Sequence, residues 1–269
     1  MREKRRRIAM TIAGSDSGGG AGIQADLKTF AAWDCYGTSV VVSVTAQDTL
    51  GVHAVHPVPI DVIVAQLDAV GNDLPPDAVK TGMLGTLPAV ELVAGTIEAR
   101  GWTHYVLDPV MVASSGDHLL DPDAIEAVRS LLLPQARIVT PNLDEAELLT
   151  GLEVRDPESM VRAGEALLAL GANAALVKGG HLQSDILVDV LVTREGVERF
   201  ARPRIATRAT HGTGCTLSAA LTAALALGME LPEAVPAALD YLQAAIRAAP
   251  GLGKGHGPVW HGVEVFDDR

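Results

Sequence analysis

The chain has 269 residues and a formal net charge of −12, and it is 48% hydrophobic, 3% aromatic and 20% charged. This hydrophobic content excludes a disordered chain, and two cysteines are too few for a scaffold held by disulfides. The negative charge argues against a nucleic-acid partner, because phosphate backbones are bound by basic surfaces. No segment is apolar over the roughly 18 residues that a membrane span needs. We therefore expect a cytoplasmic protein without a membrane partner, in which the basic residues 1–7 form a frayed leader.

Short β-branched runs alternate with longer segments of helical spacing from one end of the chain to the other. The runs predict strands at residues 8–13, 38–45, 78–80, 105–107, 138–140, 174–177, 186–192 and 197–200. The helical spacing predicts helices around residues 60–70, 87–97 and 157–168, and two more at 213–227 and 232–249.

This alternation predicts an α/β fold with a mostly parallel central sheet and helices on both faces. Residues 193–196 leave no room for a helix between two strands, so residues 186–200 are predicted to form an antiparallel hairpin at one edge. The sequence contains no repeat or linker, and residues 1–269 are therefore expected to form a single domain.

The loop after the first predicted strand is polar and rich in glycine. It is too long for a dinucleotide-binding turn, and it lacks the Lys-Ser or Lys-Thr of a Walker loop. Two interpretations remain open. The loop is either a flexible connection, or its glycines bring backbone N–H groups to a ligand, with Asp16 and Asp26 as polar contacts.

Ligands of open α/β sheets bind beyond the carboxyl ends of the strands, and polar residues follow several predicted strands here. Gln47 offers a donor and an acceptor, which suits a heteroaromatic ring or a loop backbone. Met83 fits either the core or a pocket wall. Lys178, in a glycine-rich turn, would suit a phosphate or lie in solvent.

Two further strand ends carry carboxylates. Asn142 and Glu145 have the spacing of a capping box at the start of a helix. Alternatively, Asp108 and Glu145 could hold Mg²⁺ through its water ligands, because Mg²⁺ takes few protein ligands.

The sharpest feature is the sequence of residues 210–216, Thr-His-Gly-Thr-Gly-Cys-Thr, at the start of an apolar helix. A helix N-terminus binds anions and lowers the pKa of a thiol placed there. Cys215 could then take a proton from a substrate hydroxyl while backbone N–H groups hold the charge on a phosphate. The alternative is a buried structural cysteine beside a glycine turn.

Together these segments resemble the hydroxymethylpyrimidine/phosphomethylpyrimidine kinases of thiamine biosynthesis. The resemblance is carried, in the family's order, by residues 13–28, 80–83, 108–111, 140–142 and 212–215. It implies a ribokinase-like three-layer α/β/α sandwich and a homodimer. It also implies two phosphorylations with ATP and Mg²⁺, first of 4-amino-5-hydroxymethyl-2-methylpyrimidine and then of its monophosphate.

The resemblance also implies a role for individual residues. Cys215 would be the catalytic base, and Lys178 would meet the ATP phosphates. Other positions act in groups: an anion hole of Gly212, Thr213 and Gly214; a ring site of Gln47, Gly14, Asp26, Met83 and Val110; and a Mg²⁺ site of Asp108, Asn142 and Glu145. Asp48 departs from the family's pattern, which has Asn after Gln47.

Two other functions stay open at this stage. A pyridoxal or pyridoxine kinase would act on a similar hydroxymethyl group of a nitrogen heterocycle. A non-catalytic pyrimidine-binding sensor would need neither Cys215, nor Lys178, nor the carboxylates of a metal site.

Overall fold

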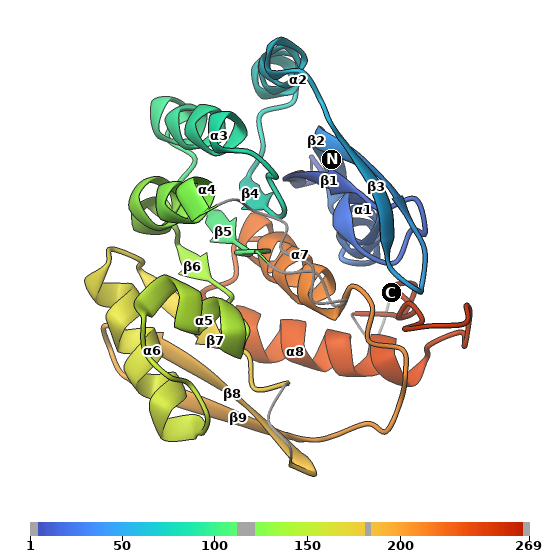
Figure 1. Cartoon of the computed structure of the whole chain (residues 1–269), viewed down its shortest axis with the longest axis vertical. Coiled ribbons are helices and arrows are strands. Elements are labelled where there is room, and N and C mark those ends of the chain that lie inside the picture. Colours follow the sequence, from blue (N-terminus) through green and yellow to red (C-terminus); the bar gives the residue numbers. More distant parts are fainter. Residues whose placement is uncertain (1–4, 112–121, 181–183, 266–269) are drawn as a thin grey trace. The chain divides into compact units, whose positions relative to one another are not determined.

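The computed structural model describes residues 5–111, 122–180 and 184–265 (Figure 1). The chain forms two compact units. The first unit is Met1–Gly82 together with Thr207–Arg269, and the second is Met83–Ala206.

The first unit holds four strands in the order β3-β2-β1-β4. Strand β1 pairs in parallel with β2 and β4, whereas β3 runs antiparallel to β2. Its elements are β1 (Ile8–Ser15), α1 (Gly22–Ala32), β2 (Tyr36–Gln47), β3 (Val52–Pro57), α2 (Ile60–Asp73), β4 (Ala78–Thr81), α7 (Thr213–Ala226) and α8 (Leu231–Arg247).

Helix α7 is the central helix of this unit. It packs against β1, β4, α1 and α8, and every residue from Thr216 to Ala226 is buried. A helix that is covered on all sides has an apolar sequence all round, which is why α7 is so rich in alanine and leucine. The α1–α8 side of the core includes Trp33 and Tyr241, whose rings meet edge to face at 5.9 Å.

The second unit holds the strands β5-β6-β7-β8-β9 in chain order. The pairs β5/β6 and β6/β7 are parallel, and β7/β8 and β8/β9 are antiparallel. Its elements are α3 (Leu87–Arg100), β5 (Tyr105–Leu107), α4 (Pro122–Ala127), a π-helical turn (Val128–Leu132), a 3₁₀ turn (Leu133–Gln135), β6 (Ile138–Val139), α5 (Leu143–Thr150), α6 (Pro157–Ala169), β7 (Ala174–Val177), β8 (Ile186–Thr193) and β9 (Val197–Pro203).

Helix α6 packs closely on β7 and β8. Gly164 makes this approach possible, because a Cβ atom at that position would lie 2.4 Å from a methyl group of Val192. Leu143 and Met160 extend the same buried cluster between α5, α6 and the sheet.

The predicted mostly parallel sheet with an antiparallel edge hairpin is confirmed, the hairpin being β8–β9. Strand β3 was not predicted. Its residues are all exposed or half-exposed, so its sequence, Val-His-Ala-Val-His-Pro, carries no alternation of buried and exposed positions. Among the described residues, no helix has the length and apolar content needed to cross a membrane.

Candidate active site

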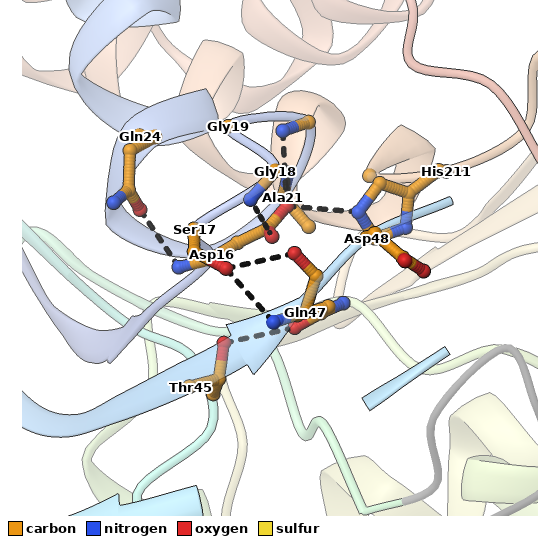
Figure 2. A network of polar contacts seen from close by, with 12 residues as sticks. Asp16, Ser17, Gly18, Gly19, Ala21, Gln24, Thr45, Gln47, Asp48 and His211 are labelled. Atoms are coloured by element: carbon orange, nitrogen blue, oxygen red, sulfur yellow. Dashed lines mark hydrogen bonds and ion pairs between the residues drawn. The ribbon is translucent and has the colours of Figure 1, made fainter. Parts of the chain in front are cut away.

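The glycine-rich loop between β1 and α1 is organised around one carboxylate, that of Asp16 (Figure 2). Its Oδ1 accepts a hydrogen bond from the Gly18 N–H at 2.8 Å. Its Oδ2 accepts from the N–H groups of Gly20 and Ala21 at 2.9 and 2.8 Å, and its backbone carbonyl accepts from Gly19. The loop is therefore pinned from within, and the hypothesis that its N–H groups face a ligand is wrong for residues 18–21.

The loop leaves β1 through an irregularity in the strand pairing. The register between β1 and β2 shifts between Ala13 and Gly14. Gly22, which begins α1, has a φ of +56°, and a Cβ atom there would lie 2.5 Å from the carbonyl oxygen of Gly14. Glycine at position 22 thus permits both the left-handed conformation and the close return of the loop to β1.

Gln47 stands at the end of β2, where the sequence placed it, and the loop fixes its backbone. Ser17 Oγ donates to the Gln47 carbonyl at 2.7 Å and accepts from the Gln47 N–H at 2.8 Å. The side-chain oxygen of Gln47 lies 3.3 Å from Thr45 Oγ1. Within the described residues the Gln47 side-chain nitrogen has no hydrogen-bond partner, so it remains available to a ligand.

Asp26 lies in the core of the first unit rather than at its surface. The side chain is fully buried, and it accepts hydrogen bonds from Thr11 Oγ1 at 2.6 Å and from Lys80 Nζ at 2.5 Å. Lys80 is also fully buried, and its Nζ lies 3.5 Å from the carbonyl oxygen of Cys215. The pair therefore joins α1 and β4 to the first turn of α7.

Cys215 lies in that first turn and is half-buried. The helix is preceded by Gly212, with a φ of +78°, which has no side chain to cap the first turn. A Cβ atom on Gly212 would lie 1.8 Å from the Gly20 carbonyl oxygen, so the turn rests directly against the glycine-rich loop. The Thr213 N–H already has an acceptor in this turn, the Thr210 carbonyl oxygen at 3.4 Å. The turn still suits an anion, because the start of a helix carries a positive partial charge.

His211 connects the loop to this turn, although nothing in its local sequence marks it as a site residue. Its Nε2 lies 2.8 Å from Asp16 Oδ2. Burial alone would raise the pKa of Asp16, but the hydrogen bonds with His211, Ala21 and Gly18 hold it below its ordinary value. Asp16 is therefore an ionised anchor for the loop and for the start of α7.

The second unit brings three of the predicted residues together. Lys178 Nζ lies 3.4 Å from Asp108 Oδ1 and 3.8 Å from Glu145 Oε2. Burial raises the pKa of Glu145 to about 7; the Lys178 charge opposes this rise and the Asp108 carboxylate adds to it. The cluster thus holds one ammonium group against two almost fully buried carboxyl groups.

Asn142 and Glu145 hold each other at the start of α5. The Asn142 side chain accepts from the Glu145 N–H at 2.9 Å, and Glu145 Oε2 accepts from the Asn142 N–H at 2.8 Å. The predicted capping box of α5 is therefore confirmed. Met83 and Val110, also in the second unit, are half-buried.

Glu145 and Asp108 fit Mg²⁺ in part. Mg²⁺ is usually held by one or two carboxylates together with waters and substrate phosphates, and a cation would relieve the repulsion between these two groups. The Asn142 oxygen is already engaged as the helix cap. Across the described ranges no set of three or more His, Cys, Asp or Glu side chains is placed to hold a metal ion.

The comparisons with known proteins agree with this picture. A family model described as phosphomethylpyrimidine kinase matches residues 16–260. A hydroxymethylpyrimidine/phosphomethylpyrimidine kinase from Rhizobium meliloti is 52% identical over 257 residues, which are 94% of this chain and 96% of that protein.

Two solved structures are similar over most of the chain. An ADP complex of Bacillus subtilis pyridoxal kinase has a TM-score of 0.91 and 42% identity, covering 96% of this chain and 98% of that one. A phosphomethylpyrimidine kinase from Clostridium difficile has a TM-score of 0.81 and 43% identity, covering 90% of this chain and 100% of that one.

The fold and these similarities define a phosphotransferase, a kinase with the ribokinase-like fold, as the sequence predicted. The chain belongs to the phosphomethylpyrimidine kinase family, whose model matches most of its length.

Proposed function

We propose that this protein carries out two successive ATP-dependent phosphorylations in thiamine biosynthesis. The first substrate is 4-amino-5-hydroxymethyl-2-methylpyrimidine, and the second is its monophosphate, which becomes the diphosphate. One observation carries the proposal. The loop that holds Gln47 through Ser17 also holds, through Asp16 and His211, the turn in front of Cys215. A ring-binding group and an anion-binding turn are thereby parts of one rigid network.

In this proposal Gln47 pairs with the edge of the pyrimidine, Gly14 frames the ring, and Met83 and Val110 supply apolar contacts to it. Asp26 supports the ring site indirectly and does not contact the ring, because its carboxylate is enclosed by Thr11 and Lys80.

Cys215 is proposed as the base of the first reaction. Its thiolate takes the proton of the substrate hydroxymethyl group. The resulting oxygen bonds to the γ-phosphorus of ATP, the bond from that phosphorus to the β,γ-bridging oxygen breaks, and ADP leaves. Gly212, Thr213 and Gly214 hold the charge on the transferred group with backbone N–H groups, which is the main task of a phosphoryl-transfer site.

Lys178 is proposed to meet the ATP phosphates, and Asp108 with Glu145 to hold Mg²⁺. Bound there, the ion would neutralise phosphate charge during transfer. Asn142 then orients Glu145 through the capping box rather than binding the ion itself.

The organisation of the whole protein is part of the proposal. We expect one domain, a homodimer, a cytoplasmic location, and no nucleic-acid or membrane partner. Sedimentation equilibrium of the purified chain tests the dimer directly.

A pyridoxal kinase remains the second candidate, because a pyridoxal kinase from Bacillus subtilis is 42% identical with a TM-score of 0.91. The test is ADP release with Mg²⁺-ATP and each of three substrates: hydroxymethylpyrimidine, its monophosphate and pyridoxal. Turnover of both pyrimidines with slow pyridoxal turnover supports the proposal, whereas turnover of pyridoxal alone would move the protein to vitamin B6 salvage.

A Cys215→Ala variant separates a kinase from a sensor. For a kinase, turnover of hydroxymethylpyrimidine should fall by about 10²- to 10⁴-fold, the usual contribution of a general base, while binding of the pyrimidine persists. Binding without ADP release in the wild-type protein would favour a non-catalytic sensor.

A further inference from the structure

The C-terminal segment of the chain lies along the turn that begins α7. Gly257 accepts a hydrogen bond from the His211 N–H at 3.1 Å and donates one to the Arg208 carbonyl. The segment then leads to His261, which is buried, with only 4% of its surface exposed. Tyr241 Oη donates to the His261 carbonyl at 2.8 Å, so the backbone of this histidine is fixed from α8.

The imidazole of His261 contacts the first turn of α7. Its Nε2 lies 3.0 Å from Thr216 Oγ1, which in turn donates to the Gly212 carbonyl oxygen at 2.8 Å. A hydroxyl group has one proton. With that proton donated to the Gly212 carbonyl, the Thr216 oxygen can accept a hydrogen bond from a His261 ring that is protonated at Nε2.

The surroundings keep this imidazole neutral. Burial lowers the pKa of His261 to about 4, and the nearby Lys28 charge acts in the same direction. At neutral pH His261 is thus a neutral ring with one N–H, and protonation at Nε2 would suit a single hydrogen bond to the hydroxyl oxygen.

The hydrogen bonds from His261 through Thr216 to the Gly212 carbonyl form a chain, called the relay below. The relay ends at the peptide that begins α7. The Gly212 carbonyl accepts from both the N–H and the hydroxyl of Thr216, each at 2.8 Å. A peptide unit is planar, so fixing the direction of the Gly212 C=O also fixes the direction of the Thr213 N–H. Gly212 itself has a φ of +78° and no side chain, so this plane is held by the Thr216 contacts at its carbonyl end and by the 3.4 Å contact between the Thr213 N–H and the Thr210 carbonyl at its other end.

We infer that His261 is a positioning residue for phosphoryl transfer, which through Thr216 sets the peptide plane of the anion-binding turn at Gly212–Thr213. The inference rests on the proposed function. It assigns a role in the reaction to a residue 46 positions after Cys215, in a segment that none of the predicted site residues occupies.

The relay predicts specific kinetics. His261→Phe keeps a ring of similar size but removes the donor, and Thr216→Val keeps the shape of the side chain but removes the hydroxyl. Each should lower kcat by about 10- to 100-fold, since a displacement of about 1 Å in a reacting group has effects of this size. The Kd for hydroxymethylpyrimidine should change by less than about 3-fold, because the ring contacts lie elsewhere.

Conservative variants and a double variant distinguish positioning from general packing. His261→Gln and Thr216→Ser restore a donor and a hydroxyl, and should recover most of kcat. The kcat of the double variant His261→Phe/Thr216→Val should lie within about twofold of the kcat of the less active single variant, because both changes break the same relay. Trp260→Phe, at an exposed neighbouring position, is the matched control and should leave kcat unchanged.

A spectroscopic measurement tests the relay without turnover. ¹⁵N NMR of the imidazole should show His261 protonated at Nε2 and neutral at pH 7. Three results would each overturn the inference. The first is a His261 ring protonated at Nδ1, the second is a double variant whose loss in kcat is the product of the two single losses, and the third is an unchanged kcat in His261→Phe. Failure of the wild-type protein to phosphorylate any of the three substrates would instead overturn the proposed function, and with it this role, while leaving the tautomer as found.

Discussion

The buried ion pair of Asp26 and Lys80 supports the first turn of α7, and its removal should be costly. Both side chains are fully buried and the two atoms lie 2.5 Å apart. Removing one partner of such a pair leaves an unpaired charge in the core, which costs about 3–5 kcal/mol. Each kcal/mol lowers Tm by about 2–4 °C in a protein of this size. Asp26→Asn and Lys80→Met should therefore each lower Tm by roughly 6–20 °C.

The double variant Asp26→Asn/Lys80→Met is the informative one. It contains no unpaired charge, and Asn can still accept the hydrogen bond of Thr11. Its Tm should lie above that of either single variant, because replacing a whole buried pair with neutral groups is much less costly than breaking it. The Lys80 change should also lower kcat, since Lys80 Nζ lies 3.5 Å from the carbonyl of Cys215.

Differential scanning calorimetry of the four proteins measures these shifts. Arg199→Gln is a suitable control, because its pair with Glu158 has both side chains largely exposed and should change Tm by no more than about 4 °C. Single variants that unfold at the wild-type temperature, or a double variant with the summed loss, would refute the view that this pair is a coupled element of the core.

Three more predictions concern titration and reactivity. The folded pKa of Glu145 is about 7 against an ordinary value of 4.5, so between these pH values the folded state binds a proton that the unfolded state has lost. Stability should therefore fall as pH rises through this window, and Tm measured from pH 4 to 8 should fall less in Glu145→Gln. Asp16 has the opposite sign: its folded pKa is below 3.8, so its contribution is present above about pH 4 and lost as pH falls through the folded pKa, and acid unfolding of Asp16→Asn should lack that part of the pH dependence. Burial raises the pKa of the Cys35 thiol to about 12, so iodoacetamide at pH 7.5 should label Cys215 first, as mass spectrometry of the folded protein would show, and equal labelling of both residues would contradict this order.

The sequence was sufficient where function depends on local pattern. The Asn142–Glu145 capping box, the position of Gln47 at the end of β2 and of Cys215 in the first turn of α7 all follow from neighbouring residues. The predicted edge hairpin has the same basis, because a four-residue connection admits no helix.

The parts that were missed depend on contacts between distant segments. His211 and Asp16 are separated by 195 positions, and Thr216 and His261 by 45. No periodicity or spacing links such pairs. The role of Asp16 in its own loop had a local signal, however, because Asp followed by glycines is typical of turns in which the carboxylate accepts backbone N–H groups.

The two proposed phosphorylations should depend on Cys215 to different degrees. The first acceptor is a hydroxyl group, which must lose its proton to become a good nucleophile. The second acceptor is an oxygen of a phosphate monoester, whose second pKa is about 6, so that at pH 8 it is already ionised and needs no base. Gln47 can bind the same ring in both reactions, and the loop that holds it is the one joined to the α7 turn.

Cys215→Ala should therefore slow phosphorylation of hydroxymethylpyrimidine by about 10²- to 10⁴-fold and phosphorylation of its monophosphate by far less. Each step is followed separately by supplying one substrate and measuring ADP release at pH 8. Cys215→Ser serves as the matched variant of similar size, and its hydroxyl, with a much higher pKa than a thiol, should not restore the first step. Equal losses in both steps would mean that Cys215 acts on the transferred phosphoryl group or on the shape of the turn, and not as a base toward the hydroxyl.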